Sequence, residues 1–117
     1  MRWFILVVLL VFPNAQAFGP PAARVGDMHS GPCTLGSPLP ILAPGAPTVL
    51  IEGMPAARAA DMAVGLVAPP SANFPPHPIA RGSATVLIGN LPAARIGDLC
   101  SIGGAIVAGA PTVLIGG

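Results

Sequence analysis

Charged residues are scarce in this sequence of 117 residues. It has five arginines, no lysine and four acidic residues, which leave a formal net charge of +1 at pH 7. A nucleic-acid-binding surface needs basic side chains clustered on one face. We therefore expect no nucleic acid among the partners of this protein.

Residues that commonly act in catalysis are also few. There is no tyrosine, no motif pairs a histidine with a Ser or Cys nucleophile, and Glu52 is the only carboxylate outside the three Arg–Asp pairs described below. General acid–base and nucleophilic catalysis need such groups close together. The glycines do not match a phosphate-binding loop. The sequence therefore argues against an enzyme.

Proline and glycine are abundant, with 16 Pro and 15 Gly. Such a composition usually indicates disorder, but 53% of the residues are hydrophobic and Val-Leu-Ile runs recur. These runs supply enough apolar side chain for a core. No segment has sustained helical periodicity. We expect an all-β structure of short strands and tight turns.

Two phrases occur three times each in the chain. The first starts with Pro-Ala-Ala-Arg and ends at an Asp; its copies span 21–27, 55–61 and 92–98, so that successive copies begin 34 and 37 residues apart. The second contains Thr-Val-Leu and predicts a short buried strand in every unit, at 48–51, 85–88 and 112–115. Residues 34–47 are rich in Pro and Gly and predict loops and turns. Units that cannot bury their apolar faces alone must pack on one another, and we expect closure into a pseudo-three-fold body.

An Arg and an Asp stand three residues apart in every copy of the first phrase: Arg24 with Asp27, Arg58 with Asp61, and Arg95 with Asp98. We predict that each guanidinium meets its carboxylate or a nearby carbonyl and closes a turn. A glycine precedes the Asp in the first and third copies, whereas the middle copy has Ala60.

Residues 1–17 do not belong to the repeat. Arg2 is followed by an apolar run over 3–12, a break at Pro13 and an Ala-x-Ala sequence that ends at Ala17. This pattern is typical of a secretory signal peptide, and it is shorter than the roughly 20 residues that a membrane-spanning helix needs. The alternatives are an apolar anchor or chaperone-bound segment, and a start codon assigned too far upstream, which we favour. We divide the chain into this segment, 1–17, and a repeat domain, 18–117.

The candidate metal ligands are the only histidines and cysteines of the chain: His29, Cys33, His77 and Cys100. Eight residues after each repeat proline stand His29, Ala63 and Cys100, and closure around an axis is expected to bring such equivalent positions together. His77 is then placed to fill the position that Ala63 leaves without a ligand. Two His and two Cys form a common closed zinc site, and a small turn-rich domain gains stability from a metal. The alternative is a Cys33–Cys100 disulfide in an exported protein.

The repeated phrases resemble the PAAR-repeat proteins. The resemblance rests on Pro-Ala-Ala-Arg at Pro21, Pro55 and Pro92, each followed by a Thr-Val-Leu strand, and it covers the chain from Phe18 onward. It implies a small conical pseudo-three-fold β-domain that caps the trimeric valine-glycine repeat (VgrG-type) spike of a bacterial type VI secretion system, at one monomer per trimer. It also implies zinc near the vertex, bound at the matching positions His29, His77 and Cys100, and we choose Cys33 as the fourth ligand.

The expected role that follows from this resemblance is mechanical. The protein would sharpen the spike for membrane puncture, contact the target membrane transiently and serve as a bare tip or as an adaptor for separate effector proteins. It would be present in the bacterial cytoplasm before firing and then be delivered outside or into a target cell; with a genuine signal peptide it would be periplasmic. The rival hypotheses are an exported zinc-binding structural protein unrelated to a spike and, less favoured, a zinc hydrolase.

Overall fold

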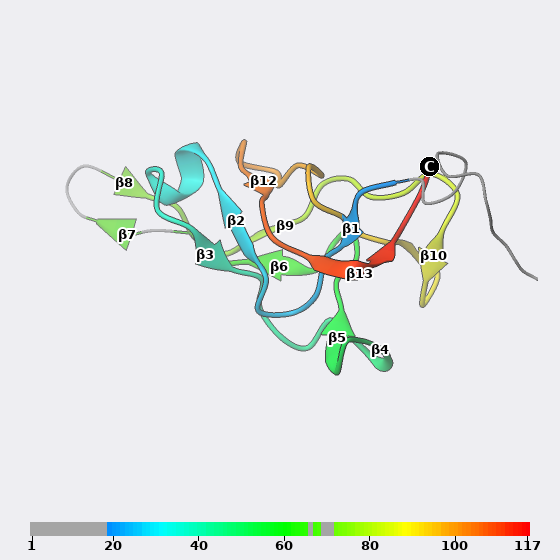
Figure 1. The fold of residues 1–117 in the computed structure, drawn as a ribbon. Coiled ribbons are helices and arrows are strands. Elements are labelled where there is room, and N and C mark those ends of the chain that lie inside the picture. Colours follow the sequence, from blue (N-terminus) through cyan, green and yellow to red (C-terminus); the bar gives the residue numbers. More distant parts are fainter. Residues whose placement is uncertain (1–18, 66, 69–71) are drawn as a thin grey trace, which may run out of the picture.

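The computed structural model describes residues 19–65, 67–68 and 72–117, and the predicted segment 1–17 lies outside them. No helix within these ranges is long and apolar enough to cross a membrane. The described residues form short strands and one 3-10 helix (Figure 1): β1 (Pro21–Ala22), β2 (Met28–Ser30), η2 (Pro32–Thr34), β3 (Leu39–Pro40), β4 (Ala46–Ile51), β5 (Met54–Ala56), β6 (Met62–Ala63), β7 (Val67–Ala68), β8 (Ala72–Asn73), β9 (His77–Pro78), β10 (Leu87–Ile88), β11 (Leu91–Pro92), β12 (Ala105–Ile106) and β13 (Ala110–Leu114).

Closed rings of backbone hydrogen bonds join the three units. The amide of Ala23 donates to the carbonyl of Ala94 at 2.9 Å, Ala94 donates to Ala57 at 3.0 Å, and Ala57 donates back to Ala23 at 3.0 Å. In a second ring, the amide of the residue after each repeat arginine donates to the carbonyl of the repeat proline of a neighbouring unit. These bonds, 2.8–3.0 Å long, run from Val25 to Pro55, from Ala59 to Pro92 and from Ile96 to Pro21. Because each unit donates to one neighbour and accepts from the other, the chain closes around an axis. The predicted pseudo-three-fold all-β body is confirmed.

The Arg–Asp pairs form the same turn in every unit, as predicted. In the first unit, the backbone N–H and the Nε–H of Arg24 both donate to Asp27 Oδ2, at 2.8 and 2.9 Å, while Nη2 donates to Oδ1 at 2.9 Å. The corresponding distances are 2.8, 3.2 and 3.1 Å in the second unit and 2.8, 3.1 and 3.1 Å in the third. The bidentate contact fixes the side chain of the arginine and its backbone together.

The backbone of this turn is left-handed at the residue before the Asp. Gly26 and Gly97 both have φ of +93°, and Ala60 has φ of +80°. A Cβ at Gly97 would meet no atom within 4 Å, so a side chain fits there in space. The cost of Ala60 is therefore conformational, because a left-handed backbone brings Cβ close to the carbonyl oxygen.

Glu52, the acid outside the Arg–Asp pairs, is occupied in a structural contact. Arg24 Nη1 donates to its Oε1 at 3.0 Å, and the hydroxyl of Thr112 donates to its Oε2. These bonds lower the pKa of Glu52, the contact with Thr112 most of all. The carboxylate thus links the β4–β5 hairpin to β13.

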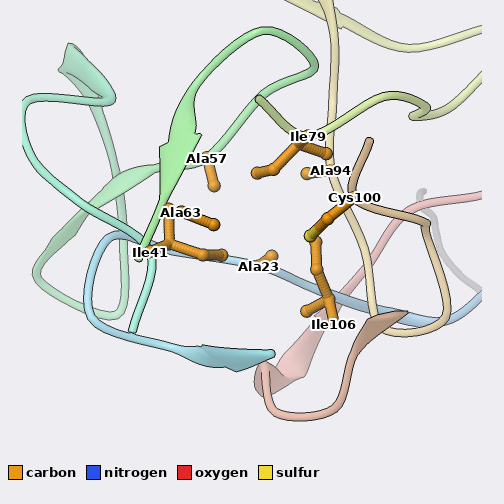
Figure 2. Packing of buried hydrophobic residues seen from close by; sticks show 8 residues of the cluster. All are labelled: Ala23, Ile41, Ala57, Ala63, Ile79, Ala94, Cys100 and Ile106. Atoms are coloured by element: carbon orange, nitrogen blue, oxygen red, sulfur yellow. The ribbon is translucent and has the colours of Figure 1, made fainter. Parts of the chain in front are cut away.

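Two apolar layers fill the body, and each takes equivalent residues from all three units. One layer contains Ala22, Ala46, Ile51, Ala56, Ala93, Ala110 and Ile115. The other contains Ala23, Ile41, Ala57, Ala63, Ile79, Ala94, Cys100 and Ile106, whose side chains point toward one another from differently coloured segments in Figure 2. Small alanines near the axis allow the three chain segments to approach closely enough for the backbone rings to form.

Three predictions of local structure need correction. The strands predicted to be buried at 48–51 and 112–115 are largely exposed, with Leu50 62% and Leu114 38% exposed, because only one side of each strand faces the apolar layer. The second predicted strand, 85–88, is reduced to β10, because Ser83 stands where the other units have Ala46 and Ala110, and its hydroxyl accepts hydrogen bonds from the amides of Thr85 and Val86, at 3.2 and 2.9 Å. Such a local side-chain contact competes with strand pairing. Residues 34–47, predicted as loops and turns, also contribute the end of η2, all of β3 and the start of β4.

Candidate metal centre

His29 lies on β2, the central strand of the three-stranded sheet β12–β2–β3, opposite Ile106 on one side and Leu39 on the other. Its side chain is fully buried. Nε2 lies 2.7 Å from the carbonyl oxygen of Val64. A carbonyl only accepts, so Nε2 carries the proton and Nδ1 keeps a free lone pair.

Cys33 lies in η2, the short 3-10 helix directly after β2. Thr34 anchors this helix on Gly31: its hydroxyl donates to the carbonyl of Gly31 at 3.1 Å and accepts from the amide of Gly31 at 3.2 Å. Cys33 is fully buried, and its Sγ lies 3.8 Å from His29 Nδ1. The turn therefore directs the thiol at the nitrogen with the free lone pair.

His77 is 3% exposed and lies on β9, directly opposite Ala63 on β6. Its Nδ1 donates to the carbonyl of Pro75 at 3.0 Å, which leaves Nε2 as the nitrogen with a lone pair. Nε2 is buried and has no hydrogen-bond partner among the described residues. A buried polar atom without a partner is costly, and one that lies beside a thiol and a second imidazole fits a metal ligand.

The three side chains form one compact donor set. One ring nitrogen of each histidine and Cys33 Sγ lie within 4.8 Å of one another, and the two rings meet edge to face with centroids 5.4 Å apart. In a tetrahedral zinc site a sulfur and a nitrogen ligand are about 3.6 Å apart, given the usual bond lengths. The observed 3.8 Å between Sγ and Nδ1 is close to this value. Each imidazole donates its other N–H to a backbone carbonyl, as zinc-binding histidines usually do.

Burial sets the protonation of the group. It lowers the pKa of His29, so that this imidazole is neutral and able to bind a metal at neutral pH. Burial also raises the pKa of the Cys33 thiol, although the backbone N–H groups of Cys33 and Gly104 act in the opposite direction. A metal stabilises the thiolate that burial disfavours.

Cys100 does not belong to this donor set. Its thiol is 3% exposed and packs in the apolar layer with Ala63 and Ile79. Burial and the neighbouring Cys33 raise its pKa to about 11. Both cysteines are free thiols, so the structure does not contain the alternative disulfide.

Sequence reasoning missed the groups that support the donor set. The carbonyls of Val64 and Pro75 orient the two imidazoles, and no side-chain pattern marks a backbone acceptor. Gly104 lies against the thiol, where a Cβ would be 2.9 Å from Cys33 Sγ. The pair Gly103-Gly104 so soon after Cys100 was the one available signal for a close approach of the backbone.

The fold and the donor set define a class: a small, closed, three-unit β-repeat protein with a buried His–Cys group that is suited to a structural metal. Comparison with family models agrees, since the PAAR motif matches residues 7–64 and 38–108 in two overlapping segments. The chain belongs to the PAAR-motif family, a structural family associated with the spike tips of type VI secretion systems. Comparison with curated proteins finds no match.

Proposed function

We propose that this protein caps the end of a trimeric VgrG-type spike, one monomer per trimer. The observation that carries the proposal is the closed ring of hydrogen bonds among Ala23, Ala57 and Ala94, which gives one chain three equivalent sides. A three-fold partner presents the same surface three times, so a monomer with three equivalent sides can satisfy it in full. Membership of the PAAR-motif family supports this partner.

A ring of exposed leucines is suited to the contact with the spike. Leu50, Leu87 and Leu114 occupy the same position in the three units and are 62%, 59% and 38% exposed. They stand on β4, β10 and β13, whereas the metal ligands lie on β2, η2 and β9 (Figure 1). Because each leucine is already partly buried, covering its exposed part would contribute about 0.6–2 kcal/mol.

The test is binding to each VgrG-type trimer of the host, with stoichiometry measured by native mass spectrometry. Changing Leu50, Leu87 and Leu114 together to Ser should weaken binding about 100-fold, given that burial energy. The matched control changes a second ring of equivalent exposed residues to Ser, namely Met28, Met62 and Leu99. Wild-type protein that binds none of these trimers would overturn the proposal, and equal losses in both triple variants would overturn the assignment to the leucine ring.

The metal in this proposal is zinc, with a structural role. His29, Cys33 and His77 would hold it, and Cys100 is proposed as the fourth ligand on sequence grounds. Bound zinc would link β2 and η2 to β9, and β2 and β9 belong to different sheets. The ligand side chains are at most 3% exposed, which favours a closed site over a catalytic one. Elemental analysis should find about one zinc per chain, and thiol titration after zinc removal should recover both cysteines; metal-free protein of unchanged melting temperature would refute the role.

Passage through a membrane is the last part of the proposal, and the distribution of charge supports it. No Asp, Glu, Lys or Arg occurs at 28–42, 62–80 or 99–107, the stretches that contain the metal ligands and exclude the leucine ring. An uncharged end avoids the large cost of moving charges into hydrocarbon. The protein would act from the cytoplasm, with effectors as cargo. N-terminal sequencing of native protein tests this location, because a chain processed after Ala17 would instead support an exported protein unrelated to a spike.

A further inference from the structure

In each unit the backbone of one isoleucine hydrogen-bonds to the Asp of the Arg–Asp turn. This shared contact identifies equivalent positions of the three units near the metal centre. The amides of Ile41, Ile79 and Ile106 donate to the carbonyls of Asp27, Asp61 and Asp98, at 2.9, 2.8 and 3.0 Å. Two residues before these isoleucines stand Leu39, His77 and Gly104. In the sheets Leu39 is paired with His29 and His77 with Ala63. In the third unit the carbonyl of Gly104 accepts a hydrogen bond from the amide of Cys100 at 2.7 Å. The third unit therefore has no side chain at the position where the second unit has His77.

The space beside Gly104 is occupied by ligands from the first unit. A Cβ at Gly104 would lie 2.9 Å from Cys33 Sγ and 3.3 Å from His29 Nδ1. A methyl group cannot approach a sulfur atom so closely without displacing it. The backbones also cross here, since a Cβ at Gly31 would be 2.6 Å from the Cα of Gly104. Strand β2 and helix η2 thus rest directly on the 103–104 turn.

We propose that Gly104 is a positioning residue of the metal centre: its missing side chain leaves the space in which Cys33 joins the donor set. The donor set takes His29 and Cys33 from the first unit and His77 from the second, and Gly104 of the third unit lies against the first two. Cys33 supplies a ligand from outside the repeat pattern, and only a glycine in the third unit lets it reach the site. This inference rests on the proposed metal site.

The experiment compares zinc affinity in wild-type protein and in G104A by competition with a chromophoric chelator. Substitutions beside metal ligands typically cost 10- to 100-fold in affinity, and we expect a loss in that range. Cobalt-substituted G104A should also have weaker thiolate-to-cobalt charge-transfer absorption, because Cys33 is displaced. The matched control is G109A, whose Cβ would lie 2.6 Å from the carbonyl oxygen of Ala22. It should lower the melting temperature without changing zinc affinity or the cobalt spectrum.

A second background keeps the inference testable if G104A folds poorly. In C33A the closest neighbour, the sulfur at 2.9 Å, is gone, and the nearest atoms left are His29 Nδ1 and the Ser30 carbonyl oxygen at 3.3 Å. Adding G104A to C33A should therefore cost much less zinc affinity and melting temperature than adding it to wild-type protein. An equal loss on adding G104A in both backgrounds would overturn the inference, as would unchanged zinc affinity in G104A. Failure of wild-type protein to bind zinc would instead refute the proposed metal site itself.

Discussion

Replacing His77 with leucine should have opposite effects on stability with and without metal. In metal-free protein, Nε2 of His77 is a buried polar atom without a partner among the described residues, and such an atom costs about 1–3 kcal/mol. The substitution also removes the hydrogen bond from Nδ1 to the carbonyl of Pro75, worth about 1 kcal/mol. Pro75 is exposed, so water can take over its carbonyl. We expect H77L to be as stable as wild type, or up to about 2 kcal/mol more stable, in chelator.

Zinc should reverse this order. A ligand at about 1,000 times its Kd stabilises the state that binds it by about 4 kcal/mol. For a domain of this size that corresponds to a rise in Tm of roughly 15–30 °C in wild-type protein, with little or no rise in H77L. The assay is thermal unfolding by circular dichroism under reducing conditions, with excess chelator and with excess zinc.

His29 provides the comparison. Its Nε2–H already has a partner, at 2.7 Å from the carbonyl of Val64, so H29L loses a satisfied bond and should be destabilised by about 1 kcal/mol or more even in chelator. If H77L is less stable than wild type by more than about 2 kcal/mol in chelator, the view of Nε2 as an unsatisfied atom is wrong. An equal rise in Tm with zinc for H77L and wild type would exclude His77 as a ligand.

Three further predictions concern the frame around the metal. A60G removes the strain of an alanine in a left-handed backbone and should be more stable than wild type by about 0.5–1 kcal/mol in urea unfolding. G97A introduces the same strain and should lose about 1–2 kcal/mol. Two effects of the same sign would contradict the shared turn. Asp98 is 2% exposed and holds three N–H groups of its arginine, so D98A should cost about 3 kcal/mol. The side chain of Arg81 is 62% exposed and its Nε lies 3.8 Å from the same carboxylate, so R81A should cost less than about 1 kcal/mol of stability. Equal losses in D98A and R81A would refute this ranking. Burial and Cys33 raise the pKa of Cys100 from 9.0 to about 11, so the Cys100 thiol ionises first in the unfolded state as pH rises. Metal-free protein should therefore lose about 2 kcal/mol of stability between pH 9 and 11. C100A should remove most of this loss, and an unchanged pH profile in C100A would contradict the prediction.

Local features of the fold were predictable from the sequence. The Arg–Asp turns form between residues three apart, so their spacing alone specifies the contact. The repetition of the turn also predicted closure, because a unit with so little core of its own must pack on its neighbours. The strand at 85–88 was mispredicted because one hydroxyl, that of Ser83, competes for the backbone amides.

The sequence by itself therefore determined three units, the turn within each and a short set of metal-binding side chains. Only the tertiary structure decided which of these side chains meet. His29, Cys33 and His77 form one donor set, and Cys100 packs in the apolar layer. The physical reason is that the set depends on where chain segments cross, and that depends on groups without a sequence pattern. These groups are two backbone carbonyls that orient the imidazoles and a glycine whose missing side chain makes room for sulfur.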